Sequence, residues 1–189
     1  MPDLPGRGHR PSGYLGISRR PTAREWRRAL LLFAGGIVVL TLMFAFIHPQ
    51  PSLLAVGSTA PPVHLDSAAG GAVTLPAAAG AQPYIVEFFE TGCSHCQEAA
   101  GRLCHERVPV FAIDAAKESA PTISAFRQRY AAGCSYPMLL DPTFSAVTAY
   151  AVTAVPTVYL VRLGRIVFAG AGPDGVDALP AAVQKATGG

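Results

Sequence analysis

Residues 84–96 read YIVEFFETGCSHC, and this stretch decides the fold of the larger part of the chain. Its first six residues, Tyr84–Phe89, are apolar apart from one glutamate and rich in β-forming types, which predicts a buried strand. Cys93-Ser94-His95-Cys96 follows and opens a helix that we expect to reach about Arg107. Pro109 would end that helix, because proline cannot donate a backbone hydrogen bond. The sequence thus predicts a strand–turn–helix unit with two cysteines at the mouth of the helix.

The spacing of Cys93 and Cys96 suits thiol chemistry. At a helix start, free backbone N–H groups and the macrodipole favour a thiolate at Cys93. Cys96 lies one turn later on the same face, close enough for a disulfide to close. His95 adds a nearby partial positive charge, which favours the reduced pair and makes it a better oxidant. The alternative is half a zinc site, but Cys104 and Cys134 are not spaced as further ligands, so we expect no metal.

Short strands and helices alternate around this unit. Apolar and β-rich runs predict strands at 63–65, 72–75, 110–113, 138–140, 157–161 and 165–169. Helical patterns cover residues 121–130, 144–150 and 175–186. Gly70-Gly71 and Leu163-Gly164 mark the turns of two hairpins, one of them N-terminal. The order predicts an α/β fold with a mixed central sheet flanked by helices.

A long apolar segment precedes this domain. Residues 29–47 contain no charged residue, Asn, Gln, His or Pro. As a helix they would span roughly 28 Å, close to the roughly 30 Å hydrocarbon core of a bilayer. We expect one transmembrane helix. A cleaved signal peptide is the alternative, but its apolar region would be shorter and followed by small residues, whereas His48-Pro49-Gln50-Pro51 follows here.

Charge is unevenly distributed along the chain. Residues 1–28 carry seven arginines and two acidic residues, whereas residues 48–189 carry eight basic and ten acidic ones. The basic arm indicates membrane topology rather than nucleic-acid binding, and it should stay in the cytoplasm. We therefore expect a cytoplasmic, disordered basic arm (1–28), a signal anchor in the cytoplasmic membrane (29–47), a linker (48–56) and an extracytoplasmic catalytic domain (57–189).

Further short motifs support a family resemblance. Residues 56–61 read VGSTAP, residues 139–142 LLDP, residues 150–152 YAV and residues 155–157 VPT. With the strand and Cys-x-x-Cys, these motifs resemble the thioredoxin superfamily over about residues 56–187, and within it the membrane-anchored TlpA/ResA-like thiol–disulfide oxidoreductases of the redoxin group. The resemblance implies a thioredoxin fold. It also implies disulfide exchange with protein thiols, without an organic cofactor. Reduction of apo-cytochrome c or of copper-site cysteines would be an example. The electrons would come from an upstream membrane or extracytoplasmic thiol donor.

The resemblance also implies roles for individual residues. Cys93 would attack a substrate disulfide and Cys96 would resolve the mixed disulfide. Val155-Pro156 would be a cis peptide beside the sulfurs, with the Val155 backbone pairing a substrate chain. Glu87 matches a buried acid that moves the proton of Cys96, unless it faces solvent. Ser94 and His95 replace the usual proline of the motif, as in oxidase and isomerase members, so the direction of electron flow stays open.

Cys104 and Cys134 allow three interpretations. All four cysteines lie beyond the apolar segment, on the expected oxidising side. Cys104 and Cys134 could form a structural disulfide, remain unpaired, or relay electrons to the Cys93–Cys96 pair. Two other classes of function are also compatible with this fold. A copper-delivery protein would need C-x-x-x-C and a distant histidine, and a thiol peroxidase would need P-x-x-x-T-x-x-C where residues 86–93 read VEFFETGC.

Overall fold

The computed structural model describes residues 23–47 and 52–188, in two units divided after Gln50. The first unit contains one helix, α1 (Ala23–Ile47). It begins before the apolar segment, so Arg24, Arg27 and Arg28 are helical rather than part of a disordered arm. Arginine, alanine and glutamate are good helix formers, which accounts for this earlier start. The rest of the predicted arm, and linker residues 48–51, lie outside the described residues.

Residues 29–47, predicted to span a membrane, lie within α1. Among the residues described, no helix is both long enough and apolar enough to cross a membrane.

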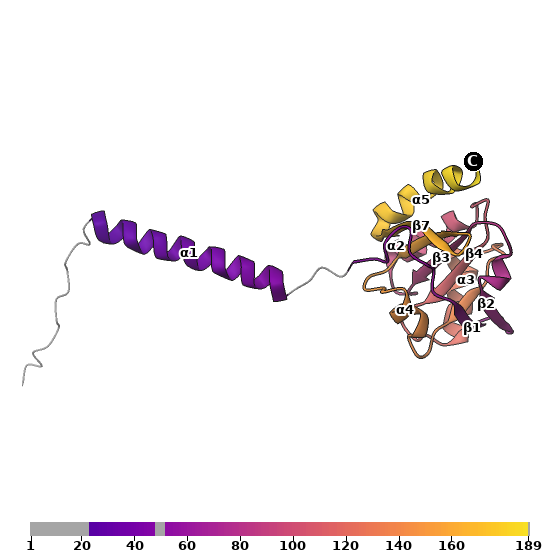
Figure 1. Ribbon diagram of the computed structural model, residues 1–189. Coiled ribbons are helices and arrows are strands. Elements are labelled where there is room, and N and C mark those ends of the chain that lie inside the picture. The colour runs from indigo at the N-terminus through magenta and orange to yellow at the C-terminus, as the bar shows by residue number, and fades with distance from the viewer. Residues whose placement is uncertain (1–22, 48–51, 189) are drawn as a thin grey trace, which may run out of the picture. The chain divides into compact units, whose positions relative to one another are not determined.

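In the described part of the second unit, seven strands form one mixed sheet in the order β2-β1-β5-β4-β3-β6-β7 (Figure 1). The strands are β1 (Val63–Ser67), β2 (Ala72–Leu75), β3 (Tyr84–Phe89), β4 (Val110–Asp114), β5 (Met138–Leu140), β6 (Thr157–Arg162) and β7 (Arg165–Ala171). β3, β4 and β5 are parallel, whereas β6 is antiparallel to β3 and to β7. Both predicted hairpins are present, and the N-terminal one extends the sheet by pairing β1 with β5.

Helices cover both faces of the sheet, as Figure 1 shows with α5 and α4 at opposite sides of the domain. They are α2 (Ser94–Leu103), α3 (Ala120–Tyr130), α4 (Ser145–Ala149) and α5 (Gly172–Thr187), with a short 3₁₀ turn at Ala77–Ala79. One core cluster packs buried side chains of α2, α3 and α5 against the sheet. The other packs α4 and residues 53–60, at the start of the second unit, against the opposite face. This layered arrangement is the predicted α/β fold.

The strand β3 alternates its side chains between the two cores. Ile85 and Phe89 belong to the core under α2, whereas Val86 and Phe88 belong to the other. Every residue of β3 is buried, as expected for a strand between parallel and antiparallel neighbours in a sheet covered on both faces. Glu87 has the same parity as Ile85 and Phe89, so it is placed on the α2 side.

The LLDP motif has a structural role. The buried carboxylate of Asp141 accepts hydrogen bonds from the backbone N–H groups of Ser145 (2.8 Å), Ala146 (2.8 Å) and Val147 (3.0 Å). These are donors that the first turn of α4 leaves without intrahelical partners. Asp141 therefore fixes the start of α4 and contributes to the fold rather than to the chemistry.

Two glycines set the approach of α5 to the sheet. A Cβ at Gly170 in β7 would lie 2.7 Å from the Cα of Gly175 in α5, and the reverse substitution is equally crowded. Only glycine lets the two backbones come this close. The close contact seats α5 beside α2, on the face of the sheet that carries the cysteine pair.

Candidate active site

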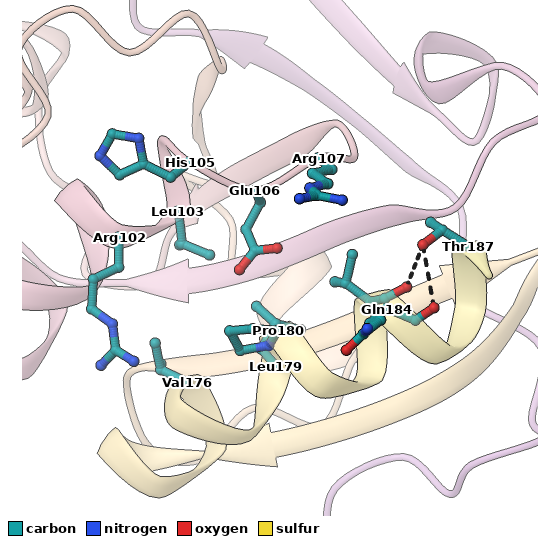
Figure 2. Close-up of a pocket in the computed structure, with 11 residues that line it drawn as sticks. Arg102, Leu103, His105, Glu106, Arg107, Val176, Leu179, Pro180, Gln184 and Thr187 are labelled. Carbon is teal, nitrogen blue, oxygen red and sulfur yellow. Dashed lines mark hydrogen bonds between the residues drawn. The ribbon is translucent and has the colours of Figure 1, made fainter.

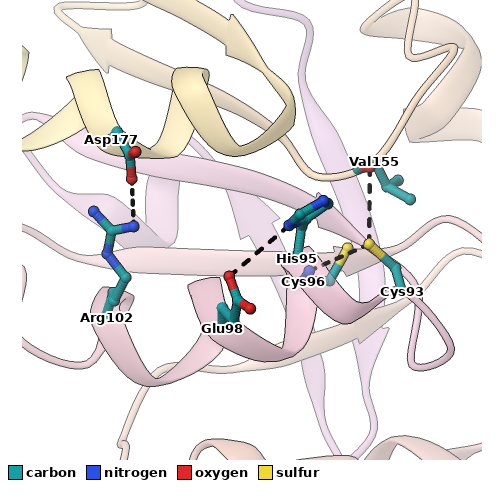
Figure 3. Close-up of polar contacts among 7 residues, drawn as sticks. All are labelled: Cys93, His95, Cys96, Glu98, Arg102, Val155 and Asp177. Atoms are coloured by element: carbon teal, nitrogen blue, oxygen red, sulfur yellow. Dashed lines mark hydrogen bonds and ion pairs between the residues drawn. The ribbon is translucent and has the colours of Figure 1, made fainter.

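The Cys93–Cys96 pair lies where β3 passes into α2. Cys93 is the N-cap residue of α2, and its Sγ accepts a hydrogen bond from the backbone N–H of Cys96 at 3.2 Å (Figure 3). Cys93 is partly exposed, whereas Cys96 is completely buried, and neither is in a disulfide. One sulfur is thus open to a substrate while the other is shielded beneath it. This difference suits an attacking and a resolving thiol, respectively.

The loop before β6 brings a proline to the same sulfur. Val155-Pro156 is a cis peptide, and the Cys93 thiol donates to the Val155 carbonyl oxygen at 3.8 Å. Pro156 is buried and Val155 half-buried. The Thr157 hydroxyl donates to the Ala154 carbonyl oxygen at 2.7 Å and so fixes the loop from its other side. The structure therefore places Val155 and Pro156 beside Cys93, as the family resemblance implies.

Glu87 is buried under α2 and does not face solvent. Its residue exposure is 1%, and its Oε1 has no hydrogen-bond partner among the described residues. Burial raises the pKa of this carboxyl to about 8, because a charge is poorly stabilised in an apolar interior. Such a group can gain or lose a proton near neutral pH.

Cys96 shares that environment. Burial raises the pKa of the Cys96 thiol, and its hydrogen bond with Cys93 and the charges of Cys93 and Glu87 raise it further. A buried thiol of this kind is a poor nucleophile until a base takes its proton. Glu87 lies on the α2 side of β3, and its charge is among the causes that raise the Cys96 pKa, so Glu87 is a candidate for that base.

The two residues between the cysteines are at the surface. Ser94 and His95 are exposed, and the His95 Nδ1 lies 3.8 Å from the Glu98 carboxylate, one turn along α2 (Figure 3). Any charge on His95 is thus shared with a carboxylate and with solvent. Solvent screening at this exposed position weakens the expected electrostatic influence of His95 on Cys93.

Three site residues were not predicted. The Tyr136 hydroxyl donates to the Ala100 carbonyl oxygen in α2 at 3.0 Å, and burial raises the pKa of this phenol, as does the charge of Glu87. Glu118 and Gln97 both hydrogen-bond Thr91, two residues before Cys93. None of the three belongs to a recognisable motif, and only the folded chain brings Tyr136 and Glu118 to the site.

Cys104 and Cys134 form a disulfide with their Cα atoms 5.2 Å apart. The bond joins the end of α2 to the loop after α3, and it closes a loop of 30 residues. Such a loop corresponds to roughly 3 to 4 kcal/mol of chain-entropy stabilisation. Cys104 lies eleven residues after Cys93 in the sequence. That is about 16 Å along a helix, and the nearer Cys96 is about 12 Å away, so both are too far for direct exchange in this conformation.

A cavity lies at the other end of α2 from the cysteine pair. It has a volume of about 510 Å³ and is lined by residues of α5, by Arg102 and Leu103, and by residues 105–107, with Glu106 directed into it (Figure 2). It contains none of the site residues. Within the described residues, no three His, Cys, Asp or Glu side chains are grouped to hold a metal ion.

Residues 56–169 match the AhpC/TSA family. The chain belongs to that family. Sequence comparison with curated proteins finds no match.

Solved structures resemble this AhpC/TSA family member in fold. The thioredoxin domain of a thiol-disulfide oxidoreductase from Bacteroides vulgatus is 19% identical, with a TM-score of 0.56, over 69% of this chain and 99% of that one. MTB dsbF, solved in mixed oxidized and reduced forms, is 19% identical, with a TM-score of 0.58, over 66% and 95%. Peroxidoxin BcpB from Mycobacterium tuberculosis is 13% identical, with a TM-score of 0.56, over 69% and 96%. The fold is thioredoxin-like, and family and fold together make this AhpC/TSA member a thioredoxin-like oxidoreductase.

Proposed function

We propose that the domain catalyses thiol–disulfide exchange with protein substrates through Cys93 and Cys96. The observation that carries this proposal is the arrangement of the two sulfurs at the start of α2. Cys93 is accessible and accepts the Cys96 N–H at 3.2 Å, Cys96 is buried, and the Val155 carbonyl lies 3.8 Å from Cys93. An extended substrate segment could pair with the backbone beside Val155, which would bring its disulfide to Cys93.

In the reducing direction the exchange has two steps. The Cys93 thiolate attacks one sulfur of the substrate disulfide, the substrate S–S bond breaks, and one substrate thiolate leaves. The Cys96 thiolate then attacks Cys93 Sγ, which forms the Cys93–Cys96 disulfide and releases the second substrate thiolate. Two electrons pass from the dithiol to the substrate, and the two departing thiolates take up two protons. An external dithiol must then reduce the enzyme again.

Glu87 supports the second step. Cys96 is a buried thiol with a raised pKa, so it must lose a proton before it can attack. Ionised Glu87 can accept that proton, because its own pKa of about 8 lies close to neutral pH. Glu87 therefore acts as the general base for Cys96.

For the location and the substrates, support comes from the sequence. The uncharged segment 29–47 and the arginine-rich arm before it favour an anchor in the cytoplasmic membrane with the domain outside. We propose that the substrates are cysteine pairs of extracytoplasmic proteins, such as apo-cytochrome c or copper-site cysteines. An upstream membrane or extracytoplasmic thiol donor would supply the electrons.

The reduction potential of the Cys93–Cys96 pair tests the direction of exchange. His95 is exposed, so solvent screens its effect on the reduced pair, and we expect a potential closer to the roughly −270 mV of thioredoxin than to the roughly −120 mV of DsbA. Equilibration with dithiothreitol and glutathione buffers, followed by alkylation of free thiols, measures it. A value close to that of DsbA would assign the protein to disulfide formation instead.

A thiol peroxidase is the second candidate, favoured by the AhpC/TSA family match. In that reaction the Cys93 thiolate would attack hydrogen peroxide, the O–O bond would break with release of water, and the resulting sulfenic acid would condense with the Cys96 thiol to a disulfide and release a second water. Hydrogen peroxide oxidation of Cys93 in stopped flow separates the two candidates. Exchange with a protein disulfide that is much faster than oxidation by peroxide supports the oxidoreductase assignment.

A further inference from the structure

Thr91 makes three hydrogen bonds in the turn between β3 and α2. Its backbone N–H donates to Glu118 Oε2 at 3.1 Å, and its hydroxyl donates to Glu118 Oε1. Its carbonyl oxygen accepts from Gln97 Nε2 in α2 at 2.9 Å. Each polar atom of Thr91 therefore has a partner, and Cys93 lies two residues further on.

Glu118 is itself held in place. It lies in the turn from β4 to α3, where the buried carboxylate of Asp114 accepts from the backbone N–H groups of Ala116 at 2.9 Å and Glu118 at 2.6 Å. The N–H of Ala115 donates to the Phe89 carbonyl oxygen at the end of β3 at 2.8 Å. The turn is thus tied to both central strands, so the Glu118 carboxylate is a fixed anchor for Thr91.

We propose that Glu118 is a positioning residue for the exchange reaction. It acts through Thr91 and holds Cys93 at the start of α2, within reach of Cys96, while a substrate is bonded to Cys93. This inference rests on the proposed thiol–disulfide exchange. Glu118 acts on the placement of the sulfur and does not touch it.

The two steps of exchange make different demands on this anchor. The first step needs only that Cys93 be accessible to the substrate disulfide. The second step needs Cys96 to approach Cys93 Sγ from within the protein, so that the new S–S bond forms as the substrate thiolate leaves. Gly92 precedes Cys93 and gives the backbone wide conformational freedom. Without the Thr91 contacts, a bound substrate could draw Cys93 away from Cys96, so the second step depends on Glu118.

A single-turnover reaction of the full chain with glutathione disulfide separates the two steps. Reduced protein is mixed with the disulfide, quenched in acid at set times, and analysed by mass spectrometry for the glutathione adduct and the internal disulfide. For Glu118→Ala we expect the second rate constant to fall about tenfold, as for a small misplacement of a reacting group, while the first is unchanged. The adduct should therefore accumulate in this variant and not in the wild-type protein.

Two further variants control for charge and for folding. Glu118→Gln keeps both contacts, because its amide oxygen accepts from the Thr91 N–H and its amide N–H₂ donates to the Thr91 hydroxyl, so it should restore the wild-type rate. Ser119→Ala removes the neighbouring side chain that caps α3 through the Thr122 N–H at 3.4 Å. It should lower stability without accumulation of the adduct.

The outcomes are distinct. Four results would each overturn the positioning role. In Glu118→Ala, these are a second step at the wild-type rate, or equal slowing of both steps. The others are a Glu118→Gln variant as slow as Glu118→Ala, and adduct accumulation in Ser119→Ala. Failure of the wild-type protein to form either the adduct or the internal disulfide would instead refute the proposed exchange reaction.

Discussion

Replacing Cys93 with serine should abolish disulfide reductase activity, lowering insulin reduction by at least about a thousandfold, because a serine hydroxyl is not ionised near neutral pH. Insulin turbidity with dithiothreitol as the electron source measures the loss. Cys93 is the partly exposed member of the pair, and Cys96 is buried, so Cys96 should not replace it as the attacking group.

The second disulfide provides a matched control. The double variant Cys104→Ser/Cys134→Ser also removes sulfur from the domain, and Cys104 lies about 12 to 16 Å along α2 from the active-site cysteines. It should lower the free energy of unfolding by roughly 3 to 4 kcal/mol and leave turnover largely intact. Unchanged turnover in Cys93→Ser would refute the assignment of the nucleophile, and loss of turnover in the double variant would favour an electron relay through Cys104 and Cys134.

The substitution Glu87→Gln should stabilise the protein above neutral pH. In the folded protein the pKa of Glu87 is raised from about 4.5 to about 8, so the native state retains a proton that the unfolded chain releases over this range. The Glu87 contribution to the free energy of unfolding therefore falls as pH rises from about 4.5 to about 8. A shift of this size corresponds to at most about 5 kcal/mol, and Glu87→Gln should remove it.

Urea unfolding of the oxidised protein at several pH values isolates this effect, because Cys93 and Cys96 do not titrate as a disulfide. Burial also raises the pKa of Asp114, so the comparison must be the difference between wild type and Glu87→Gln. The same variant should slow release of the mixed disulfide at neutral pH, since Cys96 loses its base. Equal pH dependence of stability in the two proteins would show that the pKa of Glu87 is not raised in the folded state.

The sequence is most informative where chemistry depends on local structure. The order of strand, Cys-x-x-Cys and helix predicts the placement of both active-site sulfurs, and the VPT motif predicts that Pro156 lies beside them. Helix α2 ends at Leu103 rather than near Arg107, because the chain turns there to enter β4. The sequence pattern predicts that the helix continues to the next proline, because it contains no signal for an earlier turn.

Contacts between distant segments could not be predicted. Whether Cys104 and Cys134 bridge depends on how the loop after α3 meets the end of α2, which no local pattern encodes. Glu118 has no motif, and its role arises only because Asp114 fixes its backbone next to Thr91. The burial of Glu87 required the structure as well, since a glutamate in an apolar strand could have faced solvent.

The central claim is that Cys93 carries the substrate and Cys96 releases it. The most direct measurement uses Cys96→Ser, which leaves the first step intact and removes the second. After reaction with a disulfide-bonded protein substrate, non-reducing electrophoresis and peptide mass mapping should find a stable mixed disulfide at Cys93. Absence of such a complex, or a substrate attached at Cys104 or Cys134, would contradict the account.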